Sequence, residues 1–140
     1  MSAFHSYIGY LAQYLVAQIK GAGITQNVYV EGGPNAVQSV PDNFCIVTFP
    51  LTYRNKGPFQ LHYVRVEMVA KDMENGRTDI LSIEEMANKY LDLFPIHYGR
   101  FTLSSPLIRT RAHDGLGHHS WTIQCQCMVN TTDKYPISND

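Results

Sequence analysis

The sequence predicts a single α+β domain in which two amphipathic helices pack on one face of a mainly antiparallel sheet, in the order α-β-β-β-α-β-β. Two observations carry this prediction. Apolar residues recur at helical spacing in residues 4–19 and 83–94, and they alternate with polar residues in 60–70 and 119–130. At 140 residues, the chain has the size of one ordinary domain.

The domain is predicted to span residues 1–130. Residues 131–140 are polar, contain one proline and follow no period, which predicts a flexible C-terminal tail. The sequence shows no internal repeat, no low-complexity tract and no linker long enough to separate two domains.

The first helix is predicted from one apolar stripe at steps of three and four residues: Phe4, Ile8, Leu11, Leu15 and Ile19. Either Ser2 or Ser6 could cap its start. Lys20 followed by Gly21 and Gly23 supplies the cation and the left-handed stop that are typical of a helix end.

Strands are predicted next at residues 27–31 and 44–49, separated by a long loop at 32–43 that is rich in turn formers. The run 44–49 is apolar on both faces, which favours an interior strand. Residues 55–58 contain Gly and Pro, so we expect a hairpin there.

A half-covered antiparallel strand is predicted at residues 60–70. One face carries Val64, Val66, Met68 and Ala70, which we expect to be buried. The other carries Arg65, Glu67 and Val69, which we expect to contact water or a partner.

The second helix has a predicted start signal, in which Ser82 and Glu85 form a capping box. Leu81 is expected to pack onto Met86 as a hydrophobic staple. Helical spacing of apolar residues continues to residue 94, and Pro95 is expected to end the helix.

The last two strands are predicted at residues 101–111 and 119–130, joined by a reversal at 114–117. Pro106 is expected to break the first of them or place it at a sheet edge. The second buries one face, comprising Trp121, Ile123, Cys125, Cys127 and Val129. The uncovered sheet face is therefore expected to carry Arg65, Glu67, Gln124 and Gln126.

Composition argues against several kinds of function. The formal net charge is −1 and the basic residues do not cluster, which disfavours nucleic acid as the primary partner. Three cysteines are an odd and sparse set, which favours reduced thiols in a cytosolic compartment. Residues 1–20 resemble neither a signal peptide nor a membrane span, so a soluble protein without membrane contacts is expected.

No catalytic or metal site is predicted, and we expect a protein that is not an enzyme and needs no cofactor. The one metal-like group of residues combines two cysteines with three histidines: Cys125, Cys127, His113, His118 and His119. Adjacent histidines on a strand point to opposite faces, and cysteines two apart on a strand lack the tight loop of a zinc site. Buried cysteines that pack as small core residues are the preferred interpretation.

Tyr7, Tyr10 and Tyr14 follow helical spacing beside the apolar stripe of the first helix. They widen its apolar arc beyond what a small sheet has to cover, which favours a second contact surface. The alternative is that they line the edge of the core with their hydroxyl groups in water.

The chain resembles the tail terminator and minor capsid proteins of tailed bacteriophages and prophages. The resemblance rests on the order of elements together with the segments "VYVEGG", "LHYVRVEMVAKD", "SIEEMANKYLDLF" and "GHHSWTIQCQCMVN", and it covers nearly the whole chain. It implies a structural virion protein, assembled in the host cytoplasm. Subunits would form a ring, a hexamer in this family, that ends tail-tube polymerisation at the head-proximal end.

The resemblance also implies partners. These are other copies of the chain, the tail tube protein and the head completion or connector protein, with DNA passing through the lumen only as cargo. As interface residues we expect Tyr7, Tyr10, Tyr14, Arg65, Glu67, Gln124 and Gln126. Another head–tail connector, a minor capsid component or a non-enzymatic protein-binding module remains an alternative.

Overall fold

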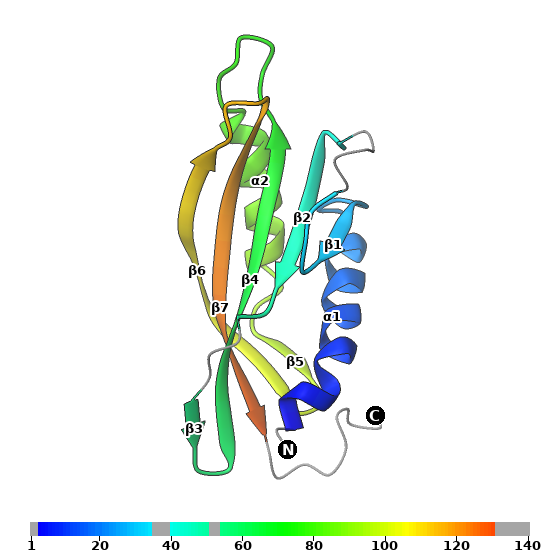
Figure 1. The fold of residues 1–140 in the computed structure, drawn as a ribbon, viewed down its shortest axis with the longest axis vertical. Coiled ribbons are helices and arrows are strands. Elements are labelled where there is room, and N and C mark those ends of the chain that lie inside the picture. Colours follow the sequence, from blue (N-terminus) through cyan, green and yellow to red (C-terminus); the bar gives the residue numbers. More distant parts are fainter. Residues whose placement is uncertain (1–2, 35–39, 51–53, 131–140) are drawn as a thin grey trace.

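The computed structural model describes residues 3–34, 40–50 and 54–130, with the side chains of all of these except residues 3–7, 55 and 56. Two helices cover one face of a single twisted sheet (Figure 1). The predicted α+β class is therefore confirmed. The predicted tail at 131–140 lies outside the described residues.

The sheet combines one parallel pair with antiparallel pairs. Its main strand order is β1-β2-β4-β7-β6-β5, and β3 pairs with β4 off this path. The strands are β1 (Val28–Val30), β2 (Asn43–Thr48), β3 (Arg54–Lys56), β4 (Phe59–Lys71), β5 (Ile96–Tyr98), β6 (Phe101–His113) and β7 (His118–Asn130). Among the described strands, β1 and β2 are the one parallel pair, so the sheet is mainly antiparallel as predicted.

Two strands, β3 and β5, were not predicted, and the order becomes α-β-β-β-β-α-β-β-β. Each has three residues, which is too short for any alternation to be recognised. The predicted hairpin at 55–58 is confirmed, because Lys56 pairs with Phe59 across the turn and Gly57 adopts a φ of 62°.

Helix α1 (Ala3–Gly21) lies against β1 and β2. Its stripe of Leu11, Leu15 and Ile19 is fully buried. The predicted stop is confirmed: Gly23 has a φ of 74°, and its N–H donates to the Lys20 carbonyl at 3.1 Å. Ser6 is not the cap of this helix, because the helix already begins at Ala3 and Ser6 lies inside it, and the other candidate, Ser2, lies outside the described residues.

Helix α2 (Ile80–Leu91) packs on β4 and β7, but its start differs from the prediction. Asp79 is the N-cap, and its carboxylate accepts the N–H of Ser82 at 3.2 Å. Ser82 therefore lies inside the helix, and the predicted capping box with Glu85 is wrong. Asp is as good an N-cap as Ser, and the cap is Asp79, three positions before the start of the predicted box.

The predicted hydrophobic staple is also wrong, because Leu81 is 80% exposed. The helix ends at Leu91, with Asp92 as its C-cap, three residues before the expected end at 94. The N–H groups of Leu93 and Phe94 continue in a tighter turn, donating to the carbonyls of Tyr90 and Leu91.

The core lies between the helices and one face of the sheet. From the strands it contains Cys45, Val47, Val64, Val66, Met68, Trp121, Ile123, Cys125, Cys127 and Val129. The predicted buried face of the last strand is therefore confirmed. Val69 is an exception among the predicted open positions: it faces away from the helices but is buried, because it pairs with Phe44 on β2 and Ser120 on β7.

Strand β6 changes register around Pro106, as the sequence predicted. Its pairing with β7 skips between Ser104 and Leu107, and Ser105 has a positive φ of 53°. Strand β5 pairs only with residues Phe101 to Leu103 of β6, so the rest of β6 forms an edge of the sheet.

Candidate functional site

The face of the sheet opposite the helices carries a row of polar side chains. Arg65 pairs with Gln124 in the register of β4 and β7, Glu67 pairs with Thr122, and Tyr63 with Gln126. The guanidinium Nε of Arg65 donates to Oε1 of Gln124 at 2.7 Å. The structure therefore brings Arg65, Glu67, Gln124 and Gln126 onto one uncovered face, as predicted from alternation.

This face is also partly apolar. Toward the β6–β7 turn it has a hollow of about 270 Å³ with a mixed lining, in which Phe44, Ile46 and Val69 lie beside polar residues such as Glu67 and Asp114. Farther along the same face, Leu107 pairs with Gln124 and is 52% exposed. A polar row beside exposed apolar side chains and a hollow of mixed lining is typical of a surface that contacts another protein.

The predicted tyrosine stripe of α1 divides into different environments. Tyr10 is 48% exposed, as a contact residue would be. Tyr14 is half-buried and its ring stacks on Tyr98 of β5, with ring centroids 4.1 Å apart, so this side chain serves the fold. The side chain of Tyr7 lies outside the described residues.

An apolar groove runs along the outer side of α1. It has a volume of about 320 Å³ and is lined by Ala12, Gln13, Val16, Ala17, Lys20 and Val30. Val30 belongs to β1, which is the other edge strand of the sheet. The two sheet edges therefore differ: one carries a groove beside a helix, and the other carries the bulged strand β6.

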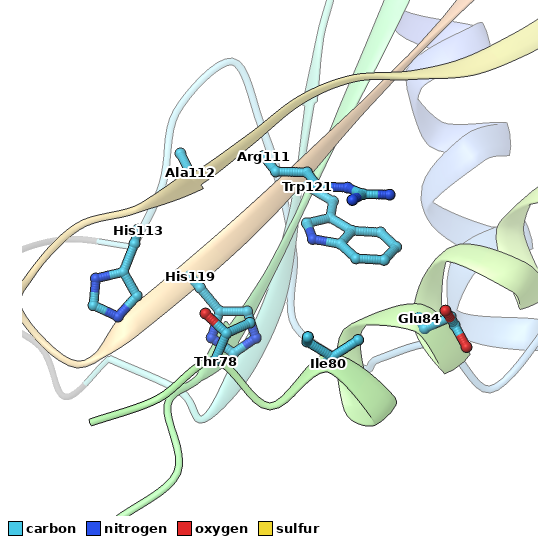
Figure 2. A pocket seen from close by; sticks show the side chains of 8 residues that line it. All are labelled: Thr78, Ile80, Glu84, Arg111, Ala112, His113, His119 and Trp121. Atoms are coloured by element: carbon cyan, nitrogen blue, oxygen red, sulfur yellow. The ribbon is translucent and has the colours of Figure 1, made fainter. Parts of the chain in front are cut away.

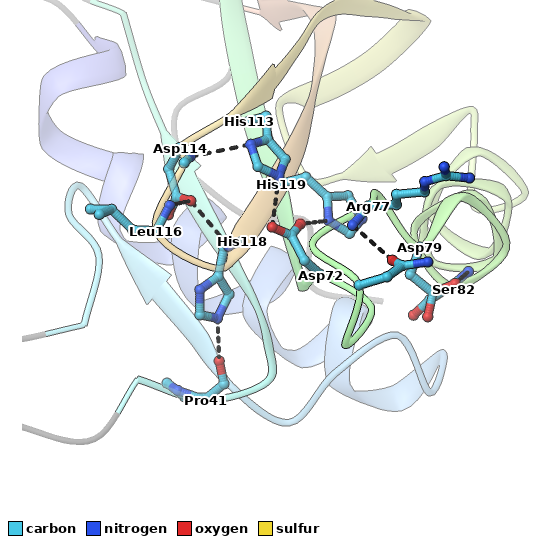
Figure 3. A network of polar contacts seen from close by, with 12 residues as sticks. Pro41, Asp72, Arg77, Asp79, Ser82, His113, Asp114, Leu116, His118 and His119 are labelled. Atoms are coloured by element: carbon cyan, nitrogen blue, oxygen red, sulfur yellow. Dashed lines mark hydrogen bonds and ion pairs between the residues drawn. The ribbon is translucent and has the colours of Figure 1, made fainter.

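A network of histidine and aspartate joins the β4–α2 loop to the β6–β7 hairpin (Figure 3). The carboxylate of Asp72 lies 2.7 Å from Nδ1 of His119 and 2.6 Å from Nε2 of His113. The backbone N–H of Asp72 also donates to the Gly117 carbonyl at 2.8 Å. One nearly buried side chain thus holds both strands of the hairpin.

The hydrogen bonds define the tautomers of both rings. His113 accepts the Gly115 N–H at Nδ1, so its proton lies on Nε2 and is donated to Asp72. His119 donates to Asp72 from Nδ1, which leaves Nε2 as the acceptor. His118 points to the other face, where Nε2 lies 3.1 Å from the Pro41 carbonyl. The expected divergence of His118 and His119 is confirmed.

The turn of this hairpin is closed by Asp114. Its carboxylate accepts the N–H groups of Leu116 at 2.7 Å and His118 at 3.0 Å. Both hydrogen bonds lower the pKa of Asp114 below its usual value, and the bond from Leu116 has the larger effect.

A cavity of about 400 Å³ lies between the first turn of α2 and the end of the β6–β7 hairpin (Figure 2). Arg111 of β6 lies over Trp121 of β7, with the guanidinium carbon 4.4 Å from the ring centroid. His119 forms part of the wall, and its Nε2 is buried with no hydrogen-bond partner among the described residues.

The cysteines are free and buried in the core. Burial raises the pKa of Cys45 and of Cys125 to about 12, and it raises the pKa of Cys127 as well. A neutral buried thiol is a poor nucleophile and a poor metal ligand. Within the described part of the chain, no three His, Cys, Asp or Glu side chains are arranged to hold a metal ion.

Sequence reasoning missed the contacts between Asp72, His113 and His119. A signal existed for the two histidines, because a hairpin closed at 114–117 can place them opposite each other on paired strands. Nothing in the sequence connects Asp72 to them, since it lies 47 positions before His119.

None of the helices in the described ranges is long and apolar enough to cross a membrane. No protein-family model matches the chain, and no match was found among curated proteins.

Proposed function

We propose that this protein is a subunit of a closed homo-oligomeric ring that caps the head-proximal end of a bacteriophage tail tube. The ring ends tube polymerisation and joins the tail to the head connector. The observation that carries this proposal is the uncovered sheet face, where the Arg65–Gln124 pair lies beside an exposed Leu107 and a hollow with a mixed lining.

The first support for the proposal is the arrangement of helices and sheet in layers. A sheet normally buries an apolar face against a second layer, and here both helices are used on one side. On the other side, Phe44 and Val69 are buried only by side chains of the sheet and its loops, such as Tyr29 and His118 around Phe44, and the apolar Leu107 is 52% exposed. A neighbouring protein chain could cover this face.

The different edges of the sheet support a ring. A contact between two different patches closes into a ring when the rotation between subunits is right. The groove along α1 and β1 is one patch, and the free edge of β6 with Leu107 is the other. Because Leu107 pairs with Gln124, side-to-side contact between these patches also brings the adjoining uncovered face against the neighbouring subunit, and it leaves the two ends of the subunit for axial partners.

The layout resemblance to tail terminators and minor capsid proteins supports the identity of the ring and suggests six subunits. Its partners are then the tail tube protein and the head completion or connector protein, and DNA passes through the lumen as cargo. The assembled ring belongs to the head–tail interface of the virion.

Mass and shape test the ring. Native mass spectrometry and negative-stain electron microscopy of the purified chain should show one closed oligomer. A protein that stays monomeric across the accessible concentration range contradicts the proposal and favours a protein-binding module.

A pair of matched variants tests the lateral patch. Ala17→Arg places a long charged side chain in the α1 groove, whereas Asn88→Arg places the same side chain on the exposed side of α2. The first should shift the population toward monomers by about tenfold or more, because an unpaired charge in an apolar contact is costly. The second should assemble normally; equal assembly of both variants excludes the groove as the lateral contact.

The uncovered face has its own test. Exchanging Arg65 and Glu67 together for Ala should leave the fold intact and weaken assembly. The control variant replaces Glu85 and Lys89 together by Ala. These residues form an exposed ion pair on α2 at 3.3 Å, so both double variants leave the net charge of the chain unchanged. If light scattering and microscopy find the same mass and the same rings for both, the Arg65–Glu67 face makes no assembly contact.

A further inference from the structure

The longest open edge of the sheet belongs to β6. Its pairing with β5 ends at Leu103, and from there to His113 it has β7 on one side and no described strand on the other (Figure 1). This stretch, residues 104–113, is the β6 edge. The short strands β1, β3 and β5 have three residues each. A long open edge presents backbone N–H and carbonyl groups that a strand of another chain could bind, so it usually needs protection against pairing.

The backbone of the β6 edge is irregular in two places. Its register with β7 shifts between Ser104 and Leu107, and again between Ile108 and Thr110. At each shift β6 has one residue more than β7. A bulge of this kind bends the strand and interrupts its row of evenly spaced donors and acceptors.

The first bulge also turns the chain and removes a donor. Ser105 has a positive φ of 53°, outside the extended region, and Pro106 has no backbone N–H. A partner strand laid along this edge would therefore meet a turned residue followed by a missing donor. The regular stretch that remains beyond the second bulge runs from Thr110 to His113, which is short for a strand ladder.

Positive charge lies on the same edge. Arg109 is the extra residue of the second bulge, Arg111 follows two positions later, and both are exposed. If the edges of two copies paired antiparallel with Thr110 at the centre, Arg109 of one copy would lie opposite Arg111 of the other. Like charges directly opposite each other on paired strands are destabilising. Bulges, proline and charged side chains are the features by which native proteins protect their edge strands.

We propose that the β6 edge is protected against strand pairing, so that this protein contacts its neighbours through side chains and not through a continuous intermolecular sheet. The protection itself does not depend on ring formation and applies to a monomer as well. One consequence rests on the proposed function: in the ring, Leu107 packs on the α1 groove of the next subunit while the backbone of the β6 edge stays unpaired.

Hydrogen exchange of the full-length wild-type protein, resolved by residue, tests the edge directly. The amides of the β6 edge that point away from β7 should exchange at least about a hundredfold faster than the amides of β7, which has a strand on both sides. Slow exchange of these amides in an assembled protein overturns the proposal and leaves the ring standing. Fast exchange in a protein that stays monomeric contradicts the ring and supports the proposal.

Removing the protection should make the edge associate. The test variant combines Pro106→Thr with deletion of Arg109, which restores one N–H and removes one bulge and one cation. The residues around the deletion keep their faces, because Ile108 and Thr110 already pair with adjacent residues of β7. The control, Arg77→Thr, removes the same charge from the exposed β4–α2 loop. By light scattering at equal concentration, the test variant should form large species at least about tenfold faster than the wild type and the control.

A rescue variant separates edge pairing from a loss of stability. Adding Thr110→Lys to the test variant returns a charge to an exposed position of the β6 edge without restoring the proline or the bulge. Association should then fall to within about twofold of the wild-type rate. Association that persists in the rescue variant, or a folded test variant that associates no faster than the wild type, overturns the protective role of the edge. If the test variant does not fold, the exchange of the wild-type amides decides.

Discussion

The carboxylate of Asp72 accepts a hydrogen bond from Nδ1 of His119 at 2.7 Å, joining the end of β4 to the start of β7 in a nearly solvent-free position. The same carboxylate holds His113 across the hairpin. A buried charge that is fully paired is costly to disturb, because removing it leaves its partners unsatisfied.

Asp72→Asn should therefore lower the free energy of unfolding by about 2 kcal/mol. One of the two histidines loses its hydrogen-bond acceptor, and both lose their contact with a negatively charged carboxylate. The control is Asp42→Asn, which affects an exposed pair with Lys71 at 3.9 Å and should change stability by less than about 0.5 kcal/mol. Urea unfolding at neutral pH measures both. Similar effects in the two variants would show that the Asp72 network adds little.

The start of α2 offers a second prediction. Asp79→Ala should destabilise the protein by about 1 kcal/mol, because the Ser82 N–H loses its cap. Ser82→Ala should change stability by only a few tenths of a kcal/mol, because Ser82 lies inside the helix and Ala is the better helix former. Thermal unfolding of the two variants decides between Asp79 and Ser82 as the cap; a larger loss for Ser82→Ala would restore the capping box.

Tyr90 gives a prediction of opposite sign. Its ring is fully buried and packs edge-on against Phe94, but its hydroxyl group has no hydrogen-bond partner among the described residues. Tyr90→Phe should therefore be neutral or stabilise the protein by up to about 1 kcal/mol, whereas Tyr90→Leu should destabilise it by about 2 kcal/mol through lost packing. A loss above about 1 kcal/mol for Tyr90→Phe would mean that the hydroxyl is bonded in solution.

The buried thiols predict how stability depends on alkaline pH. Burial raises the pKa of Cys45 and Cys125 from 9.0 to about 12, so above pH 9 the unfolded chain loses these protons while the folded protein keeps them. The unfolded state then binds fewer protons, and stability falls as pH rises from 9 toward 12. Urea titrations at increasing pH measure this decline, and replacing both cysteines by Ala should reduce its slope.

Thiol labelling checks the same burial independently. A disulfide reagent added near pH 8 should leave the native protein unlabelled over minutes and react with all three cysteines once the chain is unfolded. Fast labelling of the folded protein would show that the core around Cys45 opens readily.

The periodicity of apolar residues was sufficient to predict the helices and strands that bury a single face. The stripe Leu11, Leu15 and Ile19 and the alternating run from Trp121 to Val129 are buried as the spacing predicts, because an element with one apolar face can satisfy it only against the core. Short elements escaped prediction, since the three residues of β3 and β5 show no period and pair only because longer strands lie beside them.

The uncovered face was also determined by the sequence, down to the positions of Arg65 and Gln124, because side chains on a strand alternate strictly. The tertiary structure decided that Tyr14 stacks on Tyr98, because this contact requires β5 to lie next to α1. The choice of Asp79 over Ser82 as the cap was likewise decided in the folded chain, where several residues could have started the helix.

The sequence by itself thus determined which residues face inward, because burial follows from a local period. Only the tertiary structure decided that Asp72 meets His113 and His119, and that Arg111 lies on Trp121. Such contacts depend on strand register and on how a loop crosses a hairpin, and these are properties of the whole sheet.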